Sequence, residues 1–194
     1  MLTARNLAVN GIVPCDIHLD AGECVTLSGA SGSGKSLVLR ALADLDPHDG
    51  DIALDGEAQS VTPAPTWRRQ VAYLASEPGW WEDRIAPHFP DDEAVAPWLG
   101  ALGLSPTLLA QTVATASTGE RQRLALIRTL LLEPRVLLLD EPTSGLDDEA
   151  AGRVEVVLGE RLAAGTAILL VTHDRRLAER MGQRHLRIAG GVLA

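Results

Sequence analysis

The segment GASGSGKS at residues 29–36 decides the fold, because it matches the pattern Gly-x-x-x-x-Gly-Lys-Ser/Thr. A short apolar run, Cys24–Ser28, precedes it, and helical spacing of apolar residues follows from Lys35 to Asp44. Glycines allow backbone N–H groups to surround phosphate oxygens, and the helix N-terminus adds positive potential. In such a turn Lys35 reaches the β- and γ-phosphates, and the Ser36 hydroxyl can ligate Mg²⁺. The segment therefore predicts a nucleotide site between a strand and a helix.

Apolar runs and helical patterns alternate along the rest of the chain. Continuous apolar runs are typical of strands that are buried on both faces of a parallel sheet. Predicted strands are Val71–Leu74, Val136–Leu139 and Ala167–Val171, and predicted helices span residues 119–132 and 149–163. The predicted fold class is α/β, with a mainly parallel sheet core of the P-loop NTPase type.

The region after the first helix has the pattern of an antiparallel hairpin. A predicted turn at Asp49–Asp51 leads into a short strand, Ile52–Leu54, and Asp55-Gly56 is a typical hairpin turn. This pattern predicts an antiparallel β region in the N-terminal part of the chain.

The length of 194 residues predicts a single domain. Residues 80–116 break the alternation and predict a short helical subdomain, so that residues 1–79 and 117–194 form the β region and the nucleotide-binding core. Residues 94–119 carry no charge, but Pro97 and Pro106 would break a helix long enough to span a membrane. We therefore expect short packed helices in this stretch.

Charge and composition restrict the partners. Lys and Arg number 17 against 26 Asp and Glu, so the net charge is −9, and only 3% of residues are aromatic. Both values disfavour nucleic acid as a partner. Cys15 and Cys24 lack the spacing of a metal or disulfide motif, which predicts two reduced structural thiols. The first residues have no long apolar stretch behind a basic start, so no signal peptide is expected.

Two carboxylates, Asp140 and Glu141, directly follow the apolar run Val136–Leu139. Ligands of open α/β sheets bind at the carboxyl ends of the strands, which places Asp140 to hold Mg²⁺ and Glu141 to polarise an attacking water. Taken alone, the pair fits a helix cap equally well, but the phosphate loop favours the functional interpretation. His173 follows another predicted strand and is a candidate sensor of the γ-phosphate.

Four segments in this order resemble the nucleotide-binding subunits of ATP-binding cassette (ABC) transporters: GASGSGKS, STGERQRLALIRTLL, VLLLDEPTSGLD and VTHD. The resemblance covers residues 22–175 and implies ATP and Mg²⁺ as cofactors. It implies that Glu141, His173 and Lys35 are catalytic and that Ser36 and Asp140 hold the metal. The nucleotide contacts that it implies in the first segment are Gly29, Ala30, Ser31, Gly32, Ser33, Gly34, Lys35, Ser36 and Leu37.

The family's signature motif, usually Leu-Ser-Gly-Gly-Gln, corresponds to Ala-Ser-Thr-Gly-Glu at residues 116–120. Ser117 and Gly119 precede a predicted helix, and so they form a second anion site at a helix N-terminus. The resemblance implies that this site closes on the γ-phosphate held by a second copy, in a head-to-tail homodimer that sandwiches ATP. It implies nucleotide contacts from Ser117, Thr118, Gly119, Glu120 and Asp147.

Two positions depart from the family pattern. Ser76 stands where the Q-loop glutamine is expected, so we expect it to reach the metal through water, with Glu77 beside it as a substitute. The aromatic residue that stacks on adenine should lie within Leu7–Val13, but no aromatic residue precedes Trp67. A ring from Trp67 or Tyr73 is the alternative platform.

The resemblance implies an ATPase subunit that powers a membrane transporter. An integral membrane permease would be its partner and would hold it on the cytoplasmic face of the membrane. The chain is most similar to small bacterial cassette ATPases of the iron-export type, and Trp80-Trp81 are either a permease contact or core residues. The alternatives are a soluble ABC-type ATPase and a regulatory module that binds ATP without turnover.

Overall fold

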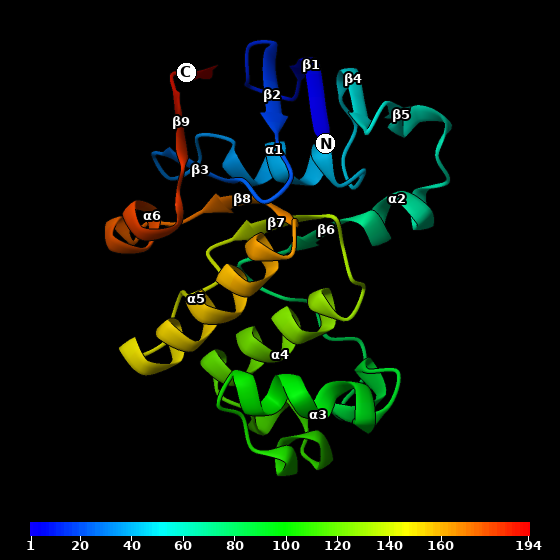
Figure 1. The fold of residues 1–194 in the computed structure, drawn as a ribbon, viewed down its shortest axis with the longest axis vertical. Coiled ribbons are helices and arrows are strands. Elements are labelled where there is room, and N and C mark those ends of the chain that lie inside the picture. Colours follow the sequence, from blue (N-terminus) through cyan, green and yellow to red (C-terminus); the bar gives the residue numbers. More distant parts are fainter.

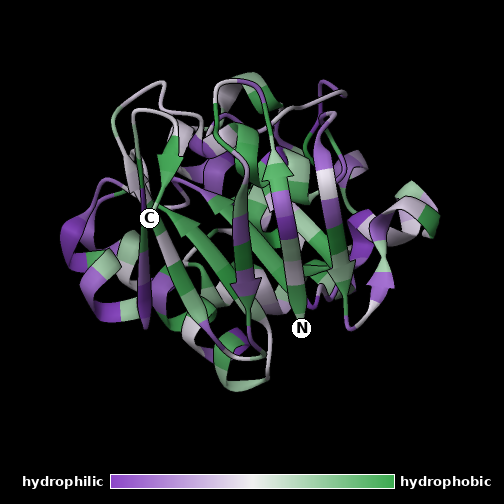
Figure 2. Ribbon diagram, turned by 90° about the horizontal axis from the view of Figure 1, so that it is seen from above, coloured by the Kyte–Doolittle hydropathy of each residue, from purple (hydrophilic) through white to green (hydrophobic). Residues whose placement is uncertain are grey.

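The computed structural model describes residues 1–194, with the exception of the Asp92 side chain. A four-stranded antiparallel sheet of order β2-β1-β4-β5 forms the upper part of the molecule in Figure 1. Its strands are β1 (Leu2–Ala8), β2 (Cys15–Leu19), β4 (Asp49–Leu54) and β5 (Glu57–Ala58). Polar and apolar residues alternate along these strands, as Figure 2 shows, so that one face is buried. The predicted antiparallel β region is confirmed.

The predicted turn at Asp49–Asp51 is wrong, because these residues belong to β4. β1 bulges between Arg5 and Ala8, and Gly50 lies against this bulge with a φ of 93°. A Cβ atom at Gly50 would collide with the backbone of Asn6, so only glycine continues the strand here. The tight turn is Asp55-Gly56, as predicted, with φ values of 49° and 85°.

A six-stranded sheet of order β10-β9-β3-β8-β7-β6 crosses the middle of the molecule (Figure 1). All neighbours are parallel except the pair β9–β10. The strands are β3 (Cys24–Gly29), β6 (Val71–Leu74), β7 (Val136–Asp140), β8 (Ala167–Val171), β9 (Arg184–Ala189) and β10 (Val192–Leu193). The four strands predicted for this sheet are confirmed, and β6 forms one edge of it.

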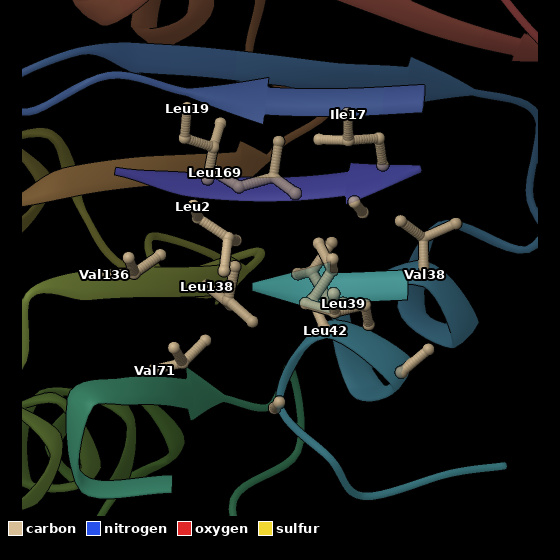
Figure 3. Close-up of a cluster of buried hydrophobic side chains, with 14 of the residues drawn as sticks. Leu2, Ile17, Leu19, Val38, Leu39, Leu42, Val71, Val136, Leu138 and Leu169 are labelled. Carbon is tan, nitrogen blue, oxygen red and sulfur yellow. The ribbon is translucent and has the colours of Figure 1, made fainter. Parts of the chain in front are cut away.

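The helix α1 (Lys35–Leu42) lies between the two sheets. Leu2 and Leu19 of the antiparallel sheet, Leu39 of α1, and Val136 and Leu138 of β7 meet in one fully buried cluster (Figure 3). This core fixes the phosphate loop, because the loop joins β3 to α1 and both elements are anchored in the cluster.

Helices cover the opposite face of the parallel sheet (Figure 1). They are α4 (Thr118–Leu130), α5 (Asp148–Ala163) and α6 (Arg175–Met181). The helix α3 (Asp92–Ala101) packs against α4 farther from the sheet, and α2 (Ala64–Gln70) precedes β6. Short 3₁₀ turns are η1 (Gln59–Val61), η2 (Ala86–His88), η3 (Pro106–Ala110) and η4 (Val113–Thr115). The expected short helices at residues 94–119 are present, and no described helix is long and apolar enough to cross a membrane.

Pro97, which we expected to break a membrane-spanning helix, lies inside α3, a helix of only 10 residues. As the sixth residue of α3, Pro97 has no N–H to donate to the backbone carbonyl of Glu93, so one hydrogen bond of this helix is missing. Pro106 begins η3, which fits the prediction. Cys15 and Cys24 are both free, and burial raises the pKa of Cys24 to about 12, as expected for structural thiols.

Candidate nucleotide site

The phosphate loop leaves β3 at Gly29 and enters α1 at Lys35. A Cβ atom on Gly29 would lie 2.6 Å from Ser33 Oγ and 2.7 Å from the carbonyl oxygen of Ile188, so the loop closes tightly on itself. Gly34 has a φ of 99° and provides no side-chain cap for α1. The first N–H groups of α1 therefore remain free for an external anion.

Lys35 is buried inside this loop. Its Nζ donates hydrogen bonds to the carbonyl oxygens of Gly29 at 3.0 Å and Ala30 at 2.9 Å. The hydroxyl oxygen of Ser33 is also buried and has no hydrogen-bond partner among the described residues. A cation, free N–H groups and an unpaired hydroxyl thus meet in one loop, and this donor set fits the phosphates of a nucleotide.

Three oxygen atoms meet at the carboxyl end of β7. Ser36 Oγ donates to Asp140 Oδ2 at 2.6 Å, and the Tyr73 hydroxyl donates to the same oxygen at 3.2 Å. Burial and the neighbouring carboxylate raise the pKa of Tyr73, so its hydroxyl stays protonated. A serine hydroxyl beside a buried carboxylate fits the oxygen ligands that Mg²⁺ prefers. The sequence analysis considered Tyr73 as an adenine platform and missed this contact, because β6 and β7 are far apart in the sequence.

Glu141 occupies a left-handed backbone conformation, with a φ of 53°, directly after β7. Its Oε2 accepts a hydrogen bond from the backbone N–H of His173 at 3.1 Å, and His173 Nε2 lies 3.2 Å from its Oε1. Burial raises the pKa of Glu141 above its ordinary value. A carboxylate with a raised pKa is a stronger base, which fits the removal of a proton from water.

Gln122 of α4 connects the carboxyl ends of β6 and β7 to the helices that cover the parallel sheet. Its side chain is buried, and its amide nitrogen lies 3.5 Å from the carbonyl oxygens of both Ala75 and Glu141. The sequence analysis did not single out Gln122, and only its position two residues after the signature motif, within the predicted helix, could have suggested a role. It joins the end of β6 to the residue after β7.

Ser117 and Glu120 form a capping box at the N-terminus of α4. Ser117 Oγ and the Ser117 backbone N–H each donate to Glu120 Oε2 at 2.8 Å, and these bonds lower the pKa of Glu120. Gly119 faces the following loop, because a Cβ atom there would lie 3.0 Å from a methyl carbon of Leu146. Asp147 caps α5 by accepting the Ala150 N–H at 2.8 Å. The signature and the loop before α5 thus form a second cluster.

The structure shows the surroundings of the two positions at which the chain departs from the family pattern. Ser76 is exposed just after β6. Trp67 is only 1% exposed and donates from Nε1 to the carbonyl oxygen of Leu42, so it is a core residue and not an adenine platform. Ile12 packs where a Cβ atom of Gly34 would lie, and Val13 is 54% exposed. The aliphatic side chain of Ile12 therefore lies beside the phosphate loop.

The sequence of residues 13–144 matches the ABC transporter family. The chain is 37% identical over 202 residues to the lipoprotein-releasing system ATP-binding protein LolD of Nitratidesulfovibrio vulgaris, covering 92% of this chain and 84% of that protein. It is 34% identical over 172 residues to the "Probable iron export ATP-binding protein FetA" of Escherichia coli K12, covering 82% and 76%.

A solved structure described as the ATP-binding subunit of an ABC transporter superposes with a TM-score of 0.88 at 28% identity, over 100% of this chain and 88% of that one. The cassette MJ0796, solved as a dimer bound to ADP and Pi, superposes with a TM-score of 0.87 at 20% identity over 100% and 96%, which supports the fold. The sequence match and the fold agree with the residues at the carboxyl ends of β3 and β7. The chain belongs to the ABC transporter family, as an ATP-binding and ATP-hydrolysing subunit.

Proposed function

We propose that this chain hydrolyses ATP to drive a membrane transporter, using the cluster Lys35, Ser36, Asp140, Glu141 and His173. The observation that carries the proposal is the short contact from Ser36 Oγ to Asp140 Oδ2, directly beside the Glu141–His173 pair. It brings a phosphate-loop hydroxyl, a candidate metal ligand and a candidate base to one edge of the sheet. This is the combination that phosphoryl transfer requires.

The residues of the phosphate loop would bind the triphosphate through the N–H groups at the start of α1 and through the Lys35 ammonium. Ser36 and Asp140 would hold Mg²⁺, with Ser76 contributing through water, and the bound ion would neutralise phosphate charge. Glu141 would accept the proton of the attacking water, and His173 would orient the Glu141 carboxylate and contact the γ-phosphate. The remaining nucleotide contacts that we propose in the loop are Gly29, Ala30, Ser31, Gly32, Ser33, Gly34 and Leu37.

A second copy would complete the site in the ATP-bound state. Ser117, Thr118, Gly119 and Glu120 lie at the N-terminus of the 13-residue helix α4, and we propose that they close on the nucleotide of the partner copy, together with Asp147. The packing of Gly119 against Leu146 supports this, because it holds the signature and the loop of Asp147 in one unit.

We propose an integral membrane permease as the partner, with the chain held peripherally on the cytoplasmic face through it. LolD and FetA share a third or more of their aligned residues with this chain, and one is named for a lipoprotein-releasing system and the other for probable iron export. The cargo would therefore be selected by the permease. We propose residues 80–116 as the helical subdomain that faces this partner, within a single domain of residues 1–194.

A steady-state ATPase assay tests the proposal, with the purified chain alone and with the membrane protein encoded beside it in a lipid nanodisc. We expect hydrolysis that increases when the membrane protein is present. Equal rates with and without it would instead indicate a soluble ATPase. Binding of ATP with no hydrolysis in either sample would indicate a regulatory module, the alternative that the exposed Ser76 and the missing adenine-stacking ring favour.

A further inference from the structure

Tyr73 is the next-to-last residue of β6, and Asp140 is the last residue of β7. The parallel register pairs Tyr73 with Leu138, two residues before Asp140. Side chains two residues apart on a strand point to the same face, so Tyr73 and Asp140 are diagonal neighbours on the face that packs against α1. The length of the tyrosine side chain then brings its hydroxyl to the carboxylate, 3.2 Å from Oδ2.

The Asp140 carboxylate needs hydrogen-bond donors, because the residue is only 3% exposed and a buried charge is costly without partners. Two side chains donate to it, Ser36 at 2.6 Å and Tyr73 at 3.2 Å, and both bonds end on Oδ2. Neither bond occupies Oδ1. Two donors on one oxygen therefore fix the rotation of the carboxylate group while they leave its second oxygen for another partner.

The two donors differ in what else they are proposed to do. Ser36 is a proposed ligand of Mg²⁺, so its hydroxyl is shared between the ion and Asp140. The Tyr73 hydroxyl makes no second hydrogen bond among the residues that the structure describes, and it has no proposed contact with the nucleotide. Tyr73 is therefore the donor that can stay on Asp140 whether or not the site is loaded.

Burial of the phenol alone does not explain this contact. Tyr73 is only half-buried, so water would satisfy a hydroxyl that pointed to solvent. Trp67, by contrast, is 1% exposed and donates to a backbone carbonyl of the core. The Tyr73 hydroxyl instead ends on the charged side chain of the candidate metal site, so the contact serves the carboxylate rather than the phenol.

We infer that Tyr73 is a positioning residue of the metal site, because its hydroxyl holds the Asp140 carboxylate in the orientation that binds Mg²⁺. The inference rests on the proposed function, in which Ser36 and Asp140 hold the ion. Hydrogen-bond donors behind a ligating carboxylate orient that carboxylate, and loss of such a donor typically lowers metal affinity about 10–100-fold. The strand β6 thus contributes a side chain to the nucleotide site without touching the nucleotide.

Calorimetry of ADP binding tests the inference, because ADP is a product and is not consumed. The contribution of Mg²⁺ is the ratio of the ADP affinities measured with Mg²⁺ and with EDTA. Tyr73→Phe keeps the ring and removes only the hydroxyl, so this ratio should fall about tenfold while the affinity in EDTA stays within about twofold. Thr129→Val is the matched control: it removes a hydroxyl that is bonded to the carbonyl of Ala125, and the ratio should not change.

A double variant separates positioning of Asp140 from a general loosening of the fold. In the Asp140→Asn background, Tyr73→Phe should lower the ratio by no more than about twofold, because the group that Tyr73 positions is already gone. A ratio in Tyr73→Phe that equals or exceeds that of the wild type would overturn the inference while leaving the metal assignment intact. A wild-type chain whose ADP affinity does not respond to Mg²⁺ would overturn both the inference and the proposed function.

A second measurement needs no substitution at Tyr73, in case Tyr73→Phe folds poorly. Tyr73 is the only tyrosine in the sequence, so 3-fluorotyrosine incorporated during expression labels this position alone. With ADP bound, addition of Mg²⁺ should shift the ¹⁹F resonance, because the ion changes the charge that the hydroxyl meets on Asp140. This shift should disappear in Asp140→Asn. A resonance that Mg²⁺ leaves in place, or shifts equally in Asp140→Asn, would overturn the inference.

Discussion

The N-termini of α1 and α4 are both expected to bind phosphate. They differ in whether side chains of this chain already form hydrogen bonds at the helix end. At α1 the N-cap is Gly34, which supplies no side-chain cap. At α4 the N-cap is Ser117, whose hydroxyl and backbone N–H are both bonded to the carboxylate of Glu120. One helix end is therefore open to an anion, whereas the other already holds an anion from its own chain.

This difference indicates how the two halves of an ATP site divide the binding. The open end of α1, with Lys35 and Ser33, can bind the phosphates within one copy of the chain. At α4, the hydroxyl and the backbone N–H of Ser117 are released only when a stronger or better-placed anion competes with Glu120. Nucleotide binding should therefore begin at the phosphate loop, and the signature should join later, when two copies meet.

The largest effect that we predict concerns Glu141. This residue follows Asp140, which is hydrogen-bonded to Ser36 of α1, and so it belongs to the same half of the site as the phosphate loop. Glu141→Gln preserves the shape of the side chain but removes the proton acceptor, so turnover should fall by roughly 10²–10⁴. ATP binding should persist, and an ATP-bound dimer should accumulate. Glu149→Gln, an exposed change at the start of α5, is the control. Hydrolysis by Glu141→Gln at the wild-type rate would show that another group is the base.

The second prediction concerns a substitution at the N-terminus of α4 alone. In the Glu141→Gln background, Ser117→Arg places bulk and positive charge at the capped helix end. Light scattering should show no ATP-bound dimer at concentrations where the single variant is dimeric. ATP affinity of the monomer should stay within about threefold (0.6 kcal/mol), because the phosphate loop is intact. A dimer of equal strength in the double variant would contradict the sandwich arrangement.

The third prediction addresses the open end of α1. Lys35→Ala removes the cation that lies inside the phosphate loop, and hydrogen bonds to charged groups contribute about 1.5–3 kcal/mol, so ATP affinity should fall by roughly 10–100-fold. Calorimetry measures this directly. Arg40→Ala, on the same helix but bonded to Asp46, should leave nucleotide affinity nearly unchanged. Unaltered affinity in Lys35→Ala would refute the assignment of the loop.

The fourth prediction concerns the base. No aromatic residue precedes Trp67, and Trp67 itself is in the core, so binding rests mainly on phosphate contacts that do not distinguish bases. ATP and GTP should therefore bind within about tenfold, or about 1.4 kcal/mol. Asn10→Tyr, at an exposed position, should tighten ATP more than inorganic triphosphate, whereas Gly11 is unsuitable because its φ is 80°. A hundredfold preference for ATP in competition titrations would reveal a contact to the base.

The features that the sequence predicted correctly depend on short-range pattern. The phosphate loop needs only its glycines and Lys35, and β7 is a continuous apolar run that ends in Asp140. Where the outcome depends on a distant strand, the local pattern is insufficient. The turn expected at Asp49–Asp51 became part of β4 because β1 supplies a bulge opposite Gly50. The strand β9 was not predicted, because among its residues only Ile188 is fully buried.

The missed side-chain contacts share the same cause. Tyr73 and Asp140 are 67 residues apart, and Gln122 lies 47 residues from Ala75, so nothing in the sequence joins them. The pair Trp80-Trp81 was noticed, but its relation to Arg128 requires the packing of α4 against the segment after β6. Only the three-dimensional arrangement shows that the Arg128 guanidinium lies near both indole rings.

The smallest effect that we predict is on stability, and its sign follows from the pKa of Glu141. Because burial raises that pKa in the folded chain, the ionised carboxylate destabilises the fold at neutral pH. This cost vanishes once the pH falls below the ordinary pKa of a glutamate, where folded and unfolded chains are both protonated. Glu141→Gln should therefore be more stable than the wild type at pH 7.5, by an amount that decreases as the pH approaches 4.5. A gain of about 1 kcal/mol would raise Tm by roughly 2–4 °C in a chain of this size. Urea unfolding of both proteins across this pH range measures the difference, and a variant that is less stable at pH 7.5 would mean that the contact with His173 outweighs the cost of burial.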